Sequence, residues 1–293
     1  MRIATWNVNS LKARLDKVRW WLERTAPDVL LMQETKLADA EAPREAFEAL
    51  GYELAHHGEG RWNGVAIASK VGLVAVVSNF GAPLGRESAD AAADDLPLGE
   101  ARMIAATCGG VRVVCIYAPN GRSIDSPFYA AKLRWFDRLA RWLEETHAPD
   151  EPLLIGGDFN VAPHDADVWD PAACHGGTHV SPPERDAFAR LEKWGLVDAY
   201  RRHHPEKERY TWWDYRAGLF YKNYGMRIDH LLVTDSVARR TVAAEIDREA
   251  RKGKPTPSDH APLLVDLDAP GLAFDPGWTG ATARIAARRT KQG

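Results

Sequence analysis

The fold is indicated first by residues 1–34, MRIATWNVNSLKARLDKVRWWLERTAPDVLLMQE. The opening MRIATWNV has the composition of a short β-strand. Ser10 can cap a helix, and apolar residues then recur at three- and four-residue intervals over 11–22, as on one face of a helix. After Pro27 the continuous apolar run VLLM is typical of a buried strand. The segment therefore predicts strand–helix–strand.

The rest of the chain repeats these element types around a β-rich middle. Short apolar runs with turn residues between them predict strands at 52–57, 62–69, 71–78, 101–107, 111–119, 152–160, 227–234 and 262–267. A long amphipathic helix is expected at 126–147, with Ser126 as its cap and Pro127 in its first turn, and another helix near 184–193. Residues 81–99 are expected to form a surface loop. This order predicts an α/β fold in which helices flank two packed mixed β-sheets.

Composition restricts the class of protein without identifying its partner. The 293 residues are 45% hydrophobic and 27% charged, as in ordinary globular proteins. The formal charge of −3 argues against a polycation that coats nucleic acid, but it allows a locally basic face. Three cysteines without a framework spacing are typical of a reducing compartment. With no signal peptide and no long apolar run, we expect a cytoplasmic protein without membrane contact.

The last part of the chain, residues 269–293, changes in character. It contains the small and basic run TARIAARRTKQG. We expect a C-terminal extension after a domain that ends at residue 268. Two interpretations remain open, namely a solvated or loosely docked appendage and an additional contact to nucleic-acid phosphates.

Polar residues collect where the predicted strands end. They are Asn7, Glu34, Asp158, Asn160, Asp229, Asp259 and His260. Several carboxylates with amide groups and little Cys or His favour a hard cation such as Mg²⁺ or Mn²⁺. A cation beside a His–Asp arrangement is suited to hydrolysis of a phosphate ester. Because neighbours in an extended segment point to opposite sides, Asp259 and His260 are expected to act separately.

One further group of potential metal ligands is Cys174, His175 and His179 in CHGGTH. A zinc site is not expected there, because a fourth ligand is missing. His164, close behind the strand that carries Asp158, is either a surface residue or a DNA contact.

Seven motifs occur in the order seen in one known family. They are TWNVNSLKAR, DVLLMQETK, GGDFNVAP, WGLVDAYR, RYTWWDYR, MRIDHLL and PSDHAP. Over residues 1–268 the chain resembles bacterial exonuclease III-type AP endonucleases of the endonuclease/exonuclease/phosphatase superfamily. The resemblance implies a four-layered, DNase I-like α/β sandwich. It also implies a DNA repair nuclease that cuts 5′ to abasic sites and removes 3′ blocking groups or nucleotides. Turning an abasic nucleotide out of the duplex costs little free energy, since it lacks a base that stacks and pairs.

The resemblance also implies catalytic roles for five residues. Asp158 would orient or deprotonate the attacking water, and Asn160 would hold the scissile phosphate. His260 would donate a hydrogen bond to a phosphate oxygen, and Asp229 would fix its tautomer and angle. Tyr117 would lie at the phosphate.

The remaining site predictions concern the metal ion and the DNA. Mg²⁺, or Mn²⁺ as a substitute, is expected at Glu34, Asn7, Asp259, Asp158 and Asn160. Duplex DNA with abasic or 3′-blocked sites is the expected partner of a monomer, through Trp212, Asn120, Arg122, Lys36, Trp62, Asn63 and Arg227. Two alternatives are a same-fold phosphodiesterase or phosphatase acting on a non-DNA phosphate ester, such as a lipid or inositol phosphate, and a non-catalytic DNA-binding module. The full set of catalytic residues disfavours the second.

Overall fold

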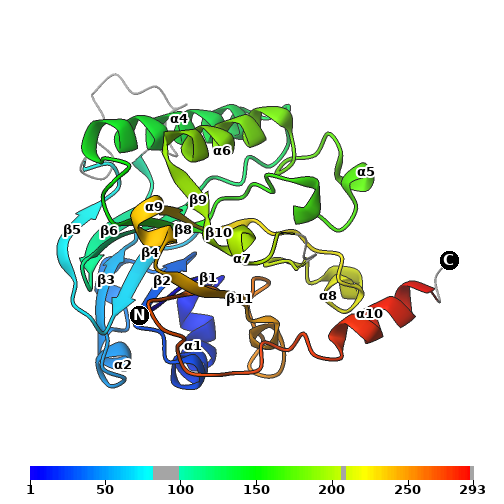
Figure 1. Ribbon diagram of the computed structural model, residues 1–293, viewed down its shortest axis with the longest axis horizontal. Helices are drawn as coiled ribbons and strands as arrows, with labels where there is room; N and C mark the ends of the chain where they lie inside the picture. The colour runs from blue at the N-terminus through cyan, green and yellow to red at the C-terminus, as the bar shows by residue number, and fades with distance from the viewer. Residues whose placement is uncertain (82–98, 206–208, 291–293) are drawn as a thin grey trace.

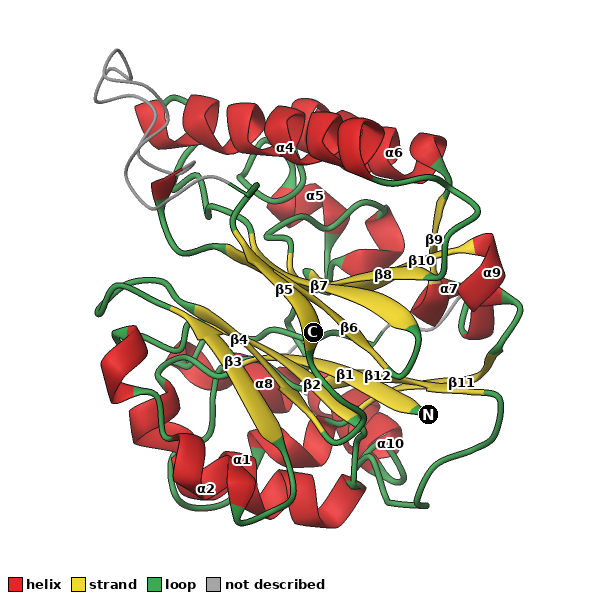
Figure 2. Cartoon of the chain, turned by 90° about the vertical axis from the view of Figure 1, so that its left-hand side faces the viewer, coloured by secondary structure: helices red, strands yellow, loops and turns green. Residues whose placement is uncertain are grey.

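Two mixed β-sheets packed face to face form the centre of the molecule, with helices on both outer sides (Figure 2). The computed structural model describes residues 1–81, 99–205 and 209–290 (Figure 1). The predicted surface loop lies outside these residues except for its two end glycines. The prediction of an α/β sandwich of two flanked sheets is confirmed.

The first sheet has the strand order β11-β12-β1-β2-β4-β3 and the second β5-β6-β7-β8-β10-β9. The strands of the first sheet are β1 (Arg2–Asn7), β2 (Val29–Gln33), β3 (Glu53–His57), β4 (Val65–Ser69), β11 (Thr241–Ile246) and β12 (Leu263–Leu267). Those of the second are β5 (Val74–Ser78), β6 (Met103–Cys108), β7 (Val111–Tyr117), β8 (Leu153–Asp158), β9 (Leu196–Asp198) and β10 (Asp229–Thr234). In each sheet one central pair is parallel, β1 with β2 and β7 with β8, and the other pairs are antiparallel.

The helices divide between the two outer faces, as Figure 2 shows for α1 and α2 on one side and α4 and α6 on the other. The helices that the structure describes are α1 (Leu11–Thr25), α2 (Arg44–Glu48), α4 (Pro127–Thr146), α5 (Pro171–Cys174), α6 (Pro182–Trp194), α7 (Ala199–His203), α8 (Leu219–Lys222), α9 (Asp235–Ala238) and α10 (Ala281–Thr290). Short 3-10 turns lie at Asp39–Glu41, Asp165–Asp167, Arg216–Gly218 and Arg248–Arg251.

Both long helices begin where the sequence predicts. The hydroxyl of Ser10 accepts a hydrogen bond from the backbone of Ala13, and that of Ser126 accepts one from Tyr129. These bonds satisfy backbone N–H groups that the first turn of a helix leaves free. The strand–helix–strand of residues 1–34 and the helix after Ser126 are therefore confirmed.

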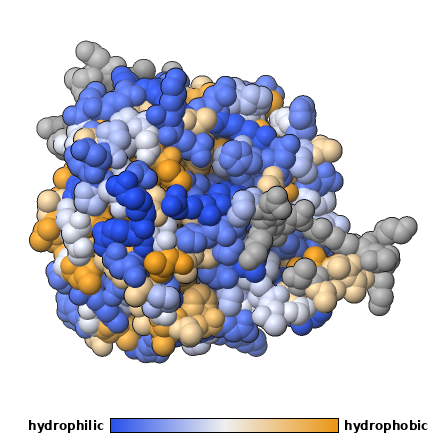
Figure 3. Space-filling view, viewed as in Figure 1, coloured by the Kyte–Doolittle hydropathy of each residue, from blue (hydrophilic) through white to orange (hydrophobic). Residues whose placement is uncertain are grey.

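Burial of apolar side chains holds the four layers together. One cluster lies between the sheets and includes Ile3, Leu31 and Leu231. A second joins the second sheet to α4 and α6, and a third joins the first sheet to α1 and α2. Hydrophilic residues cover most of the face shown in Figure 3, where hydrophobic residues form small separate patches. No helix among the described residues is long and apolar enough to span a membrane.

Residues after 268 pack against the domain at several points. Trp278 is buried and donates from its indole nitrogen to the carbonyl of Ile246, at 2.7 Å. Ile285 of α10 is also buried. Trp278 and Ile285 thus attach this segment to the rest of the chain by apolar burial.

Candidate active site

Strand direction brings the predicted site residues to one edge of the sandwich. β1 and β2 run parallel; β1 ends at Asn7, and β2 ends one residue before Glu34. Their antiparallel neighbour β12 begins shortly after His260. In the second sheet β8 ends at Asp158, and antiparallel β10 begins at its register partner, Asp229. Because the parallel strands end where their antiparallel neighbours begin, residues distant in sequence converge.

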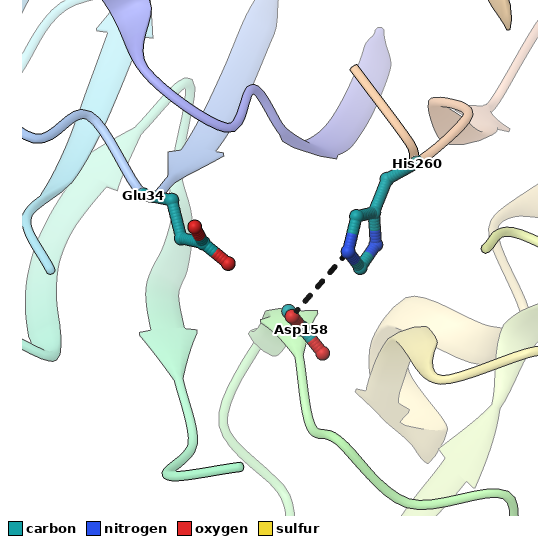
Figure 4. A group of neighbouring side chains, drawn as sticks. All are labelled: Glu34, Asp158 and His260. Carbon is teal, nitrogen blue, oxygen red and sulfur yellow. Dashed lines mark ion pairs between the residues drawn. The ribbon is translucent and has the colours of Figure 1, made fainter. Parts of the chain in front are cut away.

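Asn7, Glu34 and Asp158 join the two sheets at this edge. The amide nitrogen of Asn7 donates to Glu34 Oε1 at 2.8 Å and to Asp158 Oδ2 at 3.0 Å. Oxygen atoms of Glu34 and Asp158 and a ring nitrogen of His260 all lie within 4.8 Å of one another. Figure 4 shows these three side chains facing a common centre from three separate segments, with the His260–Asp158 ion pair dashed.

His260 is held on its other side by Asp229. Nδ1 of the imidazole lies 2.8 Å from Asp229 Oδ2, and Nε2 lies 3.9 Å from Asp158 Oδ2. The carboxylate accepts the hydrogen bond from Nδ1, which leaves Nε2 directed towards the centre. Burial opposes the charged imidazole, but the charge and hydrogen bond of Asp229 outweigh this and raise the pKa of His260.

Asp259 points to a different set of partners. Its Oδ1 accepts from the amide of Asn9 at 2.9 Å, and its Oδ2 accepts from the indole of Trp212 at 3.1 Å. Lys36 donates to Asn9 Oδ1 at 2.8 Å and pairs with Glu34 at 2.9 Å. Adjacent Asp259 and His260 therefore have separate contacts, as predicted, although Asp259 is outside the Glu34–Asp158–His260 cluster.

Asn160 and Tyr117 line the second sheet's side of the site. The backbone of Asn160 donates to Asp158 Oδ1 at 2.9 Å. Its side chain donates to the carbonyl of Ala118 at 3.0 Å and accepts from the amide of Asn120 at 3.2 Å. Tyr117 is the register partner of Asp158. Burial, and then the charge of Glu34, raise the pKa of Tyr117 well above its usual value, so the phenol stays protonated.

The donor set fits a divalent cation. Burial raises the pKa of Asp158, and the charges of Asp229 and Glu34 add to that rise against the opposing charge of His260. The shift means that burial disfavours the ionised form of Asp158, which a cation bound beside it would stabilise. Oxygen atoms of two carboxylates that converge in this way are the ligands that hard cations prefer. Glu34 and Asp158 could hold the metal ion, and His260 Nε2 lies 3.9 Å from Asp158 Oδ2.

Two predicted DNA contacts are contradicted by burial. Arg227 is fully buried, and its guanidinium pairs with Asp167 at 2.7 Å and with Asp198 at 2.6 Å. Asn63 is also buried, and its amide donates to Glu59 at 2.9 Å. Neither side chain can reach a phosphate, because each is enclosed by its own partners. The predictions for Arg227 and Asn63 are therefore wrong.

Other predicted DNA contacts are accessible. Trp62 is 74% exposed, and Asn120 and Arg122 lie at the surface. Trp212 is half-buried. The guanidinium of Arg122 stacks 3.5 Å over the ring of Phe128, which limits its freedom.

Cys174, His175 and His164 lie outside the Glu34–Asp158–His260 cluster. Among the residues that the structure describes, the group able to hold a metal ion is the one at Glu34, and it contains neither Cys174 nor His175. His179 instead donates from Nδ1 to the carbonyl of Asn160, at 2.6 Å. His164 lies on the surface.

Two groups that hold site residues in place were not predicted from the sequence. The hydroxyl of Ser258 donates to the carbonyl of Asn7 at 2.7 Å and accepts from the backbone of His260 at 3.1 Å. A buried ion pair of Lys132 and Glu184 lies below Asn160. The serine of the motif PSDHAP was a signal for the first. Lys132 lies three and four residues before Trp135 and Phe136, on the apolar face of the helix, and this position was a signal for its burial but not for its partner.

Comparison with known proteins agrees with this geometry. Residues 4–260 match the Endonuclease/Exonuclease/phosphatase family. The chain is 33% identical to an exodeoxyribonuclease III from Haemophilus influenzae, over 91% of this chain and 100% of the relative.

Solved structures show the same likeness. An AP endonuclease from Archaeoglobus fulgidus has a TM-score of 0.84 and 36% identity, over 92% of this chain and 100% of that one. A 3′ phosphatase from Neisseria, bound to a product DNA hairpin, has a TM-score of 0.82 and 38% identity over the same shares. The chain therefore belongs to the Endonuclease/Exonuclease/phosphatase family, in its metal-dependent, exodeoxyribonuclease III-type branch of DNA repair nucleases.

Proposed function

We propose that this chain uses Mg²⁺ to hydrolyse phosphate esters of duplex DNA, both 5′ to abasic sites and at 3′ ends that carry a blocking group or nucleotide. The observation that carries the proposal is the convergence of Glu34, Asp158 and His260 within 4.8 Å, with Asp229 behind the imidazole. The relatives named above include an exodeoxyribonuclease, an AP endonuclease and a 3′ phosphatase. One site that attacks a DNA phosphate accounts for all three activities.

The residues of the chain divide the reaction between them. Asp158, which faces the centre of the site beside Glu34 and His260, accepts a proton from the attacking water. His260, held by Asp229, donates from Nε2 to a phosphate oxygen as negative charge develops. Asn160 donates to the same phosphate and orients it. Bound Mg²⁺ would supply further positive charge against the developing charge on the phosphate.

The binding of DNA is proposed to use an exposed rim of this edge. Trp62, Asn120 and Arg122 are accessible, and Trp212 offers an aromatic face to an abasic sugar or a flanking base. Phosphate contacts by basic side chains release counterions, so the affinity falls linearly with salt on a double-logarithmic scale. A slope near zero would contradict a DNA-binding rim.

Three free thiols support the proposal of a cytoplasmic location, because thiols persist in a reducing compartment. We also propose that the protein acts as a monomer, since the site is assembled from one chain. The alternative of a lipid or inositol phosphate substrate has no support among the relatives named above, whose names refer to DNA or AP sites.

One experiment tests the function directly. A single purified sample is incubated with three duplexes that carry a tetrahydrofuran abasic analogue, a recessed 3′ end or a 3′-phosphate, with Mg²⁺ or with EDTA. We expect cleavage of the abasic strand and processing of both 3′ ends with Mg²⁺, and none with EDTA. Failure on all three duplexes would refute the function, and cleavage in EDTA would refute the metal requirement. Loss of one substrate alone would restrict the specificity to the other two.

A further inference from the structure

A buried ion pair lies behind the proposed phosphate-binding residues. Lys132 of α4 and Glu184 of α6 have no exposed side-chain surface, and Nζ lies 2.5 Å from Glu184 Oε1. Burial of two charges is costly unless further hydrogen bonds satisfy them, and apolar residues often replace such pairs without loss of stability. A requirement other than stability is therefore the natural reason for the pair.

Lys132 connects the pair to the site through the backbone. Its ammonium donates to the carbonyl of Asn160 at 2.7 Å and lies 3.4 Å from that of Asn120. His179 donates to the same Asn160 carbonyl. Asn160 has a φ of +52°, in the left-handed region that few residues other than glycine adopt. Two buried donors on one carbonyl oppose relaxation of this peptide.

Glu184 also binds the segment 178–181 through both of its carboxylate oxygens. Its Oε1 accepts from the backbone of His179 at 2.9 Å and from the hydroxyl of Thr178 at 3.1 Å. Its Oε2 accepts from the backbone and the hydroxyl of Ser181. The carboxylate thus gathers residues 178–181 against the same ammonium that holds Asn160.

The loop that carries Asn120 closes over the lysine stem. A Cβ atom at Gly121 would lie 3.1 Å from Lys132 Cδ, and Gly121 has a φ of +86°. Glycine is required for this approach and conformation. Asn120 in turn donates to the side chain of Asn160, so the buried Lys132 supports both amide side chains.

We propose that Lys132 and Glu184 are positioning residues of the phosphate site: they hold Asn160 in its left-handed conformation and Asn120 beside it, without contact to the substrate. This inference rests on the proposed function. The amide nitrogen of Asn160 carries two hydrogens, and Ala118 accepts one, so the other is available to a phosphate oxygen. Movement of the Asn160 peptide would misdirect that hydrogen.

A double-mutant cycle tests the proposal. Lys132→Met/Glu184→Gln removes both charges and keeps an amide oxygen that can accept from His179. It is made in the wild-type and Asn160→Ala backgrounds, and cleavage of the abasic duplex is measured under single-turnover conditions with Mg²⁺. We expect a loss of about 10- to 100-fold in the wild-type background, as for supports of site residues. In the Asn160→Ala background we expect less than about threefold, because the two changes act through one residue.

Two controls separate positioning from stability. Arg2→Met/Asp266→Asn removes another pair of nearly equal burial, whose arginine also binds carbonyl groups, and should leave the cleavage rate unchanged. Binding of the abasic duplex in EDTA should change by less than about threefold in the Lys132→Met/Glu184→Gln variant, because Asn160 and Asn120 keep their side-chain amides.

The outcomes are distinct. Equal losses in the two backgrounds, or a loss below about threefold in a cooperatively folded variant, would overturn the proposal. If the pair variant does not fold, Lys132→Gln is carried through the same cycle and judged by the same criteria. Failure of the wild-type protein to cleave the duplex would refute the proposed function instead.

Discussion

Asp229→Asn tests how much the charge behind His260 contributes to catalysis. The pair is 2.8 Å long, and the side chains are 1% and 5% exposed, so water screens it little. Asparagine can place its amide oxygen where Asp229 Oδ2 accepts the hydrogen bond. The substitution therefore removes the charge and preserves the shape.

The expected loss follows from the Coulomb energy. Two unit charges about 4 Å apart interact by about 4 kcal/mol at an effective dielectric constant of about 20. At about 1.4 kcal/mol per factor of ten, this corresponds to roughly three orders of magnitude in the protonation constant of His260. Burial opposes the imidazolium, but the charge of Asp229 outweighs burial and raises the pKa of His260 to about 10, so without that charge the pKa falls towards about 7. We therefore expect kcat to fall by about 10- to 100-fold at pH 9, where the wild-type imidazole stays charged and that of the variant does not, and by much less at pH 7.

The assay is single-turnover cleavage of a tetrahydrofuran duplex with saturating Mg²⁺ at pH 9. Asp235→Asn is the matched control, because Asp235 follows the other end of β10 and pairs with Arg239 in an exposed position. The control should match the wild-type protein, since exposed pairs contribute little. An Asp229→Asn rate within about threefold of wild type would refute the electrostatic reasoning.

The remaining predictions concern stability and DNA binding. Arg227→Met should lower the free energy of unfolding in urea by about 3–5 kcal/mol, because it leaves buried carboxylates unpaired, whereas the exposed Arg190→Met should cost less than about 1 kcal/mol; similar losses would contradict the buried assignment. Burial acts to raise the pKa of Asp167 and Asp198, but the charge of Arg227 outweighs it and lowers both. The pKa values of the two aspartates in the folded state lie below the unfolded value of about 3.9, so this stabilisation is complete above that pH and is lost as the pH falls further. Urea midpoints at pH 7 and pH 3 will measure the loss; an unchanged midpoint would count against it. Trp212→Ala should weaken binding of the abasic duplex by about 1–3 kcal/mol and Trp212→Phe by much less, as fluorescence anisotropy in EDTA can show; equal effects would argue against stacking.

Several features of the site could be predicted from sequence because they depend on strand ends. Glu34, Asp158 and Asp229 each lie where an apolar run begins or ends, and a buried carboxylate there needs a partner. Asp259 and His260 could be assigned separate contacts, since extended neighbours face opposite sides. The predicted His260–Asp229 hydrogen bond is confirmed at 2.8 Å.

Elements with a weak or short pattern were missed. β9 has three residues, and β11 alternates buried with half-buried and exposed positions at the edge of its sheet. Neither has the continuous apolar run of a central strand such as β2. α10 has too few large apolar residues to be predicted, and it is positioned by the burial of Trp278 and Ile285.

The amino-acid sequence by itself determined the two-sheet sandwich, the set of residues that converges at its edge and the class of chemistry, because period, helix caps and strand ends are local properties. Only the tertiary structure decided the environment of each charge. Arg227 and Lys132 have the composition of surface residues, yet both are buried by carboxylates that lie 29 to 60 residues away along the chain. The helical pattern marks the buried face that carries Lys132, but stable burial of either charge depends on the free energy of a long-range pair, and no local pattern identifies the partner.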